Sequence, residues 1–176
     1  MTKALVVIDV QKAMFSDPHA LPHDAEAVVD RIAGLIARAR SAGAPVFFVQ
    51  HDGGPSDDLH PGKPGFPFHD KLAPKAGDEV TVKQHSSVFH GTDFDARLKR
   101  AGVDHLVVAG MQSEYCVNSA IRGAVERGYK VTFPCDAHST FDTKVAKAKD
   151  IIALQNDTTS GSFAAVMPAA EIDFRD

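Results

Sequence analysis

The sequence predicts a three-layer α/β/α sandwich built on a mainly parallel sheet. Short, continuous apolar runs such as 4-ALVVIDV-10 recur along the chain, as in strands that are buried on both faces of a sheet. Longer segments with helical apolar spacing lie between these runs, so strands and helices alternate. Such an order gives parallel strands with right-handed crossovers, and the ligand site of such a sheet lies beyond the C-terminal ends of its strands. We therefore expect functional residues directly after strands.

The N-terminal part of the chain predicts a strand, a helix and a second strand. Asp9 falls at the end of the first strand, 4–10. Asp24 is placed to cap a helix that Gly43 ends, and the second strand follows at 45–50. The apolar residues of this helix share one face, as expected for a helix packed on a sheet: Val28, Ile32, Leu35, Ile36 and Ala39.

The segment from His51 to Gly77 is rich in Gly and Pro and has no sustained hydrophobic period. It is too long for a plain connection between two neighbouring elements. We therefore expect an ordered functional loop or lid in this part of the chain. A third strand follows at 79–83 and places Lys83 at its end.

The C-terminal half continues the alternation of strands and helices. Thr92 is placed to cap a short helix, 93–101, which Gly102 ends. The buried strand 105–110 leads into a helix that ends at Gly128 and carries its apolar residues on one face: Val117, Ala120, Ile121, Ala124 and Val125. The remaining predicted elements are a strand at 129–135, a helix at 143–156 and a short strand at 163–167.

The composition is that of one ordinary globular domain. With 176 residues, 44% of them hydrophobic, the chain can bury one core, so we expect residues 1–176 to form a single domain. A formal net charge of −4 argues against nucleic acid and anionic membrane surfaces as partners. The apolar run before Asp9 is too short for a signal peptide or a membrane span, which favours the cytoplasm. The two cysteines, Cys116 and Cys135, are then expected to be free thiols.

Three reactive residues follow strands and should meet at one edge of the sheet: Asp9, Lys83 and Cys116. If Ser113 caps the helix that follows, Cys116 lies in its first turn, where free N–H groups stabilise a thiolate. A carboxylate beside the thiol can take its proton and return it to a leaving amine, and an ammonium lowers the pKa of both groups. The three side chains therefore form a complete set for acyl transfer without histidine.

Taken singly, each of these residues has a simpler explanation. An aspartate at a strand end commonly forms a turn or caps a helix. A lysine there is usually a solvated surface charge, and a cysteine usually packs inertly in a core. Only the joint placement of the three residues after strands favours catalysis.

Cys135 ends its strand without a helix starting at once, and we interpret it as a packing residue. A dyad of Cys135 with His138 is the alternative, although nothing nearby in the sequence would orient the histidine. Asp136, His138 and Thr140 are expected to shape the loop that follows.

The long loop also contains four residues of types that bind zinc or iron, at a spacing that matches no known ligand motif: His51, Asp52, His60 and His69. A polar loop accounts for these histidines equally well. The chain has no GxGxxG after the first strand and no GxxxxGK[ST]. We therefore expect neither a metal nor a cofactor, and a small molecule as the substrate.

Several aromatic residues fall in or beside the loops of the predicted site and could wall a substrate pocket: Phe15, Phe66, Phe68, Phe89 and Tyr115. A single loop phenylalanine is more often packed against the core.

Three segments together resemble the isochorismatase-like cysteine hydrolases, a superfamily that includes nicotinamidases, N-carbamoylsarcosine amidases and isochorismatases. The segments are 5-LVVIDVQKAMF-15, 80-VTVKQHSSVFHGTDFDARL-98 and 106-LVVAGMQSEYCVNSAIRGAVERGYKVTFPCDAHST-140. The resemblance runs over nearly the whole chain. It implies a six-stranded parallel sheet in Rossmann-like order, a homo-oligomer (dimer or tetramer), and a catalytic triad of Asp9, Lys83 and Cys116.

The same resemblance implies a cis peptide bond between Met111 and Gln112. The backbone N–H groups of Gln112 and Cys116 would then point at the oxyanion that forms during the reaction. Ser87 and Phe89 fall close to Lys83 in the sequence. We expect these two residues to contact the substrate, together with Phe15 and Tyr115.

Two departures from the family patterns narrow the activity. Nicotinamidases carry a metal-binding Asp-x-His after the second strand, and Gly54 stands in place of that histidine here. Isochorismatases that cleave a vinyl ether lack the nucleophilic cysteine, whereas Cys116 is present. The sequence thus favours hydrolysis of a C–N bond in a small amide or carbamoyl compound through a thioester. Vinyl-ether hydrolysis with Asp9 as general acid and a catalytically idle binding or assembly domain are the alternatives.

Overall fold

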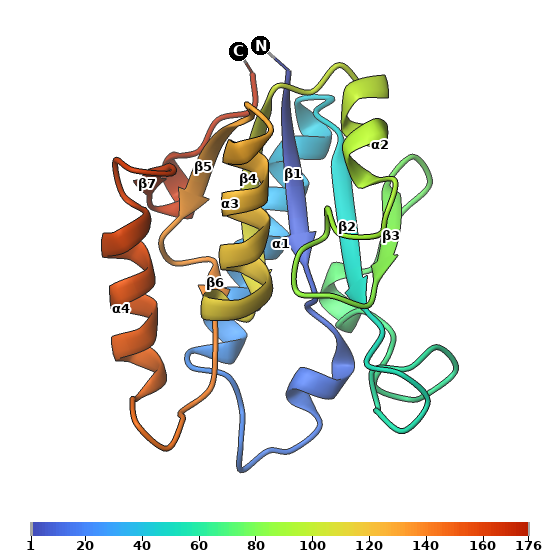
Figure 1. Cartoon of the computed structure of the whole chain (residues 1–176), viewed down its shortest axis with the longest axis vertical. Coiled ribbons are helices and arrows are strands. Elements are labelled where there is room, and N and C mark those ends of the chain that lie inside the picture. The colour runs from blue at the N-terminus through green and yellow to red at the C-terminus, as the bar shows by residue number, and fades with distance from the viewer. Residues whose placement is uncertain (1, 176) are drawn as a thin grey trace.

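The computed structural model describes residues 2–175, which form one seven-stranded sheet with helices on both faces (Figure 1). The strands pair in parallel in the order β3-β2-β1-β4-β5-β7, and β6 pairs with β4. This is the α/β/α sandwich that the alternating elements predict. The strands are β1 (Lys3–Ile8), β2 (Val46–His51), β3 (Glu79–Lys83), β4 (His105–Met111), β5 (Lys130–Pro134), β6 (His138–Ser139) and β7 (Ala165–Met167).

β1 shows why the apolar runs are continuous. Ala4, Val6 and Ile8 belong to the core on one face of the sheet, and Leu5 and Val7 to the core on the other. All five are buried because helices cover both faces.

The outer layers are built from the α-helices α1 (Ala25–Ser41), α2 (Phe94–Arg100), α3 (Asn118–Glu126) and α4 (Ala148–Thr159). α1 packs on one face of the sheet, and α2 and α3 pack on the other. α4 contacts β6 and β7. Shorter helical turns lie in the connections: η1 (Lys12–Phe15), η2 (Asp70–Leu72), η3 (Ser113–Val117) and η4 (Ala169–Glu171). Within residues 2–175, no helix has the length and apolar character needed to cross a membrane.

α4 begins later than its sequence pattern predicts, at Ala148 rather than at residue 143. The hydroxyl of Thr143 accepts hydrogen bonds from the N–H groups of Val145 and Ala146, and the carboxylate of Asp142 accepts one from Ala148 at 2.9 Å. Local side-chain bonds of this kind compete with helix formation. They hold residues 142–147 in a turn.

The predicted helix caps are also placed differently. Asp24 precedes α1 but has a left-handed backbone, with φ of 50°, and its side chain caps nothing. Asp93 occupies the cap position of α2, while the Thr92 hydroxyl accepts the N–H of Phe94 at 3.2 Å. The sheet also has one strand more than the six expected, since β6 contains only two residues and leaves no hydrophobic period in the sequence.

The long segment between β2 and β3 is ordered, because it is tied to the chain after β1. The Lys12 N–H donates to the Pro67 carbonyl at 2.8 Å, and the Gln11 side chain donates to the Phe66 carbonyl at 2.8 Å. These bonds hold the loop beside the C-terminal ends of β1 and β2, where the functional residues are expected.

Gly110 allows β4 to pass close to β1. Its φ is +127°, and an added Cβ atom would lie 2.1 Å from the carbonyl oxygen of Ile8. Gly43, after α1, also has a positive φ, of +71°, but has open space where a Cβ would stand.

We predict that Gly110→Ala lowers the free energy of unfolding much more than Gly43→Ala does. The second substitution introduces left-handed backbone strain alone, about 1–2 kcal/mol. The first adds a clash with a rigid backbone atom, so we expect a loss above about 4 kcal/mol. Urea denaturation of the two variants measures both values, and equal losses would contradict the close approach of β4 to β1.

Candidate active site

The structure brings Asp9, Lys83 and Cys116 into contact at the C-terminal edge of the sheet. Asp9 follows β1, Lys83 ends β3, and Cys116 lies in η3 after β4. The Lys83 Nζ atom lies 2.6 Å from Asp9 Oδ2 and 3.2 Å from Cys116 Sγ. Since β2 separates β3 from β1, the lysine side chain reaches across one strand to join the other two residues.

The ion pair of Lys83 and Asp9 is buried. Each residue is only 1% exposed. The second carboxyl oxygen of Asp9, Oδ1, has no hydrogen-bond partner within the described part of the chain. One oxygen of the carboxylate is thus held by the ammonium, and the other is available to accept a proton.

The backbone at Asp9 fixes where this carboxyl points. Its φ is 50°, in the left-handed region that residues with a side chain seldom adopt. The Asp9 N–H donates to the Val49 carbonyl, and the Asp9 carbonyl accepts the Gln11 N–H, each at 2.9 Å. Hydrogen bonds on both sides therefore hold an uncommon backbone conformation next to a reactive group.

Burial determines the protonation of the site at rest. It raises the pKa of Asp9, against the opposing charge of Lys83. It also raises the pKa of Cys116 to about 12, with the Asp9 charge acting in the same direction and Lys83 acting against it. The expectation of a low-pKa thiolate is therefore wrong, because loss of solvent outweighs the ammonium. The resting site holds a neutral thiol beside the pair of Asp9 and Lys83.

The turn that carries Cys116 is π-helical rather than the first turn of an α-helix. Gln112 precedes this turn, and its carbonyl accepts the N–H groups of Tyr115 and Val117, both at 3.2 Å. The peptide bond between Met111 and Gln112 is cis, the isomer that the resemblance implies.

Ser113 does not cap a helix. It lies inside η3, and its hydroxyl oxygen is 2.7 Å from the Nδ1 atom of His138. The other ring nitrogen of His138 is 3.0 Å from the side-chain oxygen of Asn156, and burial lowers the pKa of the ring to about 4. Both ring nitrogens are therefore occupied, and the structure does not form the alternative dyad of Cys135 with His138.

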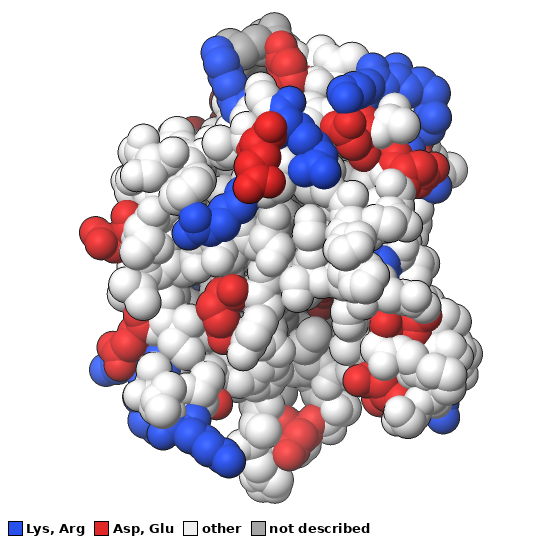
Figure 2. All heavy atoms as spheres, in the orientation of Figure 1, with Lys and Arg blue, Asp and Glu red and all other residues white. Residues whose placement is uncertain are grey.

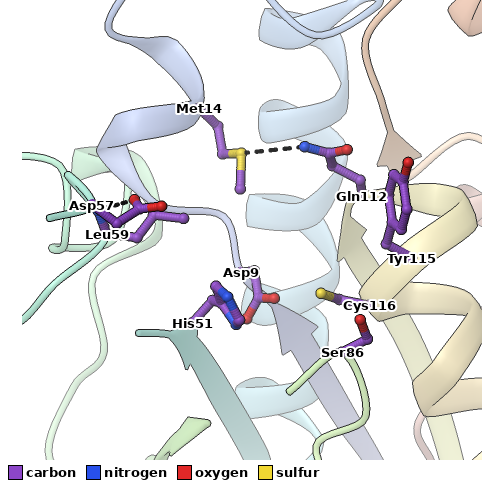
Figure 3. A pocket seen from close by; sticks show the side chains of 9 residues that line it. All are labelled: Asp9, Met14, His51, Asp57, Leu59, Ser86, Gln112, Tyr115 and Cys116. Carbon is purple, nitrogen blue, oxygen red and sulfur yellow. Dashed lines mark hydrogen bonds between the residues drawn. The ribbon is translucent and has the colours of Figure 1, made fainter. Parts of the chain in front are cut away.

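A pocket of about 310 Å³ lies beside the thiol, a volume suited to a small ligand (Figure 3). Figure 3 shows Asp9, His51 and Cys116 gathered at one end of it. The remaining lining residues form its walls: Met14, Asp57, Leu59, Ser86, Gln112 and Tyr115.

His51 is a site residue that the sequence analysis considered only as a metal ligand. Its Nδ1 atom lies 3.3 Å from Lys83 Nζ, and burial, followed by the charge of Lys83, lowers its pKa. An ammonium can only donate, so Nδ1 accepts and the neutral ring carries its hydrogen on Nε2. The buried Gln11 side chain holds the backbone of His51, accepting its N–H at 2.8 Å and donating to its carbonyl at 3.1 Å. The position of His51 at the end of a predicted strand is the one signal that could have found it.

Tyr115 lines the pocket, whereas the other three residues predicted to contact substrate do not. Phe89 is 8% exposed and packs in the core with α2 and α3. The Ser87 hydroxyl accepts the N–H of Phe89 at 3.3 Å, and the neighbouring Ser86 lines the pocket instead. Phe15 packs edge-on against His69, at 4.7 Å between ring centroids.

The candidate metal ligands of the long loop are engaged with other protein groups. The Oδ1 atom of Asp52 accepts the Gly54 N–H at 2.9 Å and lies 2.8 Å from His60 Nδ1, while Oδ2 accepts from Gln84 at 3.0 Å. The His69 ring accepts the N–H of a neighbouring residue in η2. Within residues 2–175, no three His, Cys, Asp or Glu side chains converge as a metal site.

Most of the chain matches one known protein family. Residues 3–171 match the isochorismatase domain. The chain belongs to the isochorismatase family. Its fold is thus that of the isochorismatase family, as the three sequence segments indicate.

Isochorismatase-family relatives include named hydrolases. A streptothricin hydrolase of Streptomyces noursei is 42% identical over 144 residues, which cover 82% of this chain and 52% of that protein. The chain thus spans about half the length of this relative. A ureidoacrylate amidohydrolase of Methylobacterium radiotolerans is 30% identical over 164 residues, covering 73% of this chain and 63% of that protein.

A crystal structure of a cysteine hydrolase from Pseudomonas syringae pv. phaseolicola is similar to this structure with a TM-score of 0.88 and 26% sequence identity. The likeness covers 96% of this chain and 89% of that one. Proteins similar to this isochorismatase-family chain are thus named as hydrolases.

The raised pKa of Cys116 predicts a loss of stability of this isochorismatase-family fold at alkaline pH. The pKa is about 12 in the fold, against an ordinary value of 9.0, so the folded state keeps a proton that the unfolded chain releases. The resulting stability is fully present below pH 9 and is lost as the pH rises toward 12.

Between about pH 8 and 10.5, the free energy of unfolding of the wild type should fall by about 2 kcal/mol more than that of Cys116→Ser, because a serine does not titrate in this range. Urea denaturation of both proteins across this range measures the difference. Parallel curves would show that Cys116 titrates as an exposed thiol does.

Proposed function

We propose that this protein hydrolyses a C–N bond of a small amide or carbamoyl compound, with Cys116 as the nucleophile and a thioester as the intermediate. The observation that carries the proposal is the contact of Lys83 with both Asp9 and the Cys116 sulfur, beside the pocket. Relatives named as an amidohydrolase and as a cysteine hydrolase support it.

The first step joins proton transfer to attack. The Cys116 thiol gives its proton to Asp9 Oδ1, the oxygen without a partner, while the sulfur bonds to the carbonyl carbon of the substrate. The carbonyl oxygen gains the negative charge. We assign its stabilisation to the backbone N–H groups of Gln112 and Cys116, two residues that line the pocket.

The second step releases the amine. Asp9 gives the proton to the leaving nitrogen, the C–N bond breaks, and the acyl group stays on Cys116 as a thioester. A water molecule then attacks the thioester carbon and gives a proton to Asp9, which passes it to the departing sulfur. The acid product leaves, and the thiol is restored. The Lys83 ammonium contacts both Asp9 and Cys116 and stabilises whichever of the two is negative.

The decisive test of the proposal is loss of the nucleophile. On any small amide that the wild type hydrolyses, Cys116→Ala should lower kcat/KM at least about 1000-fold, because the covalent route disappears. Intact-mass spectrometry of the wild type, quenched during turnover, should show an added mass equal to the acyl half of the substrate. Cys135→Ala, which removes the other thiol, should keep both activity and adduct.

The alternatives give different results in the same assay. Activity that survives Cys116→Ala but is lost in Asp9→Asn would indicate acid catalysis without a covalent intermediate, as in vinyl-ether hydrolysis. Absence of both turnover and adduct across a panel of amides and vinyl ethers would indicate a catalytically idle domain.

The raised pKa of Asp9 predicts the acid limb of the rate profile. Asp9 must be ionised to take the thiol proton, so activity falls as the pH drops through its pKa, which burial places above the ordinary value of 3.8. We expect kcat/KM to decline with a midpoint above pH 3.8, the ordinary value for an aspartate, while the protein stays folded by circular dichroism. A constant kcat/KM down to that pH would contradict Asp9 as the base.

A further inference from the structure

The two carboxyl groups that line the pocket differ in how their charge is balanced. Asp9 is paired with Lys83 at 2.6 Å. Asp57 lies on the wall formed by the long loop, and within residues 2–175 no Lys or Arg forms an ion pair with it. The charge of Asp57 is therefore the one that faces the pocket without a cation.

Hydrogen bonds hold Asp57 in this position. One carboxyl oxygen accepts the N–H of Leu59 at 2.8 Å, and the Asp57 N–H donates to the Gly54 carbonyl at 3.0 Å. Figure 3 shows Asp57 and Leu59 on the side of the pocket opposite Gln112 and Tyr115, away from the reactive sulfur of Cys116. The carboxylate thus stands where the far end of a bound substrate would lie.

No other group in the pocket cancels this charge. Burial and the charge of Lys83 lower the pKa of His51, which keeps its ring neutral. The Cys116 thiol is neutral at rest, and the pair of Asp9 and Lys83 has no net charge. The remaining lining side chains are uncharged, so the pocket carries one net negative charge.

The surface around the pocket carries charges of both signs. On the face seen in Figure 2, Lys and Arg side chains gather mainly at the upper end, near the N-terminal ends of the strands. In the lower half of this face, acidic side chains stand near the middle, and basic side chains lie at the left near α4 and at the right edge. The charge that a ligand meets inside the pocket is therefore that of the lining residues.

We propose that the substrate is an amide that carries a cationic group, a protonated amine or guanidine, which Asp57 binds while the scissile carbonyl lies at Cys116. The inference rests on the proposed function and adds the charge of the substrate to it. A substrate with a carboxylate at the same end would bind more weakly, because Asp57 would repel the like charge.

The test uses three primary amides of equal chain length that end in an amine, a methyl group or a carboxylate. For the wild type, kcat/KM should be about three- to tenfold higher for the amine than for the methyl compound, and lowest for the carboxylate, as expected for one partly exposed ion pair. Added salt should reduce the preference.

Asp57→Asn should bring the ratio of amine to methyl compound close to one. Asp58→Asn is the matched control, because it removes the same charge from the adjacent residue, which packs near Gly65 and does not line the pocket. It should keep the wild-type ratio. Loss of the ratio in both variants would assign the effect to the overall charge of the loop and overturn a contact with Asp57.

Dissociation constants of the same compounds for Cys116→Ala, measured by calorimetry, separate this inference from the proposed function. Turnover without a preference for the amine overturns the inference and leaves the amidase function intact. Preferential binding of the amine without turnover of any amide by the wild type contradicts the function and supports recognition of the cation. If neither turnover nor binding depends on the charge of the compound, the inference is overturned.

Discussion

Lys83 reaches from the end of β3 across β2 to the carboxyl of Asp9, and the rest of the site is arranged around this ion pair. A buried ion pair is tolerated only when its geometry is good, because both charges lose their hydration. Here the distance is 2.6 Å, and the same ammonium also contacts Cys116 and His51. The four residues come from four different segments of the chain. The charge balance of the site therefore depends on the strand order of the fold.

Buried amide side chains connect the ion pair to the wall of the pocket. Gln11 and Gln50 are 0% and 7% exposed, and both donate to the carbonyl of Phe66 in the long loop. Asp52 ties the start of that loop to Gln84, and its hydrogen bonds with Gln84, His60 and Gly54 lower its pKa to about 2. In nicotinamidases, by the resemblance described above, an aspartate at this position binds metal. In this chain its oxygens accept protein hydrogen bonds that hold the loop in place.

Much of this arrangement could be predicted from the sequence, because strands buried on both faces leave continuous apolar runs and parallel strands end at one edge. Asp9, Lys83 and Cys116 could be placed together on these grounds alone. The pocket wall could not. Whether Ser86 or Ser87 faces the substrate depends on bends between β3 and α2 that have no sequence period, and Phe89 packs in the core because α2 and α3 leave space for it. The protonation of the thiol depends on burial, which a sequence does not state.

The high pKa of Cys116 is compatible with the role proposed for it as a nucleophile, because the same burial acts on Asp9, the proposed proton acceptor. Moving the proton from sulfur to Asp9 transfers one negative charge between neighbouring atoms, both in contact with the Lys83 ammonium. The cost of the transfer depends on the difference between the two pKa values, and burial raises both. A thiolate formed next to the substrate carbonyl is also poorly solvated, which favours attack over persistence of the anion. In the proposed mechanism, the sulfur thus stays neutral until a carbonyl carbon lies beside it.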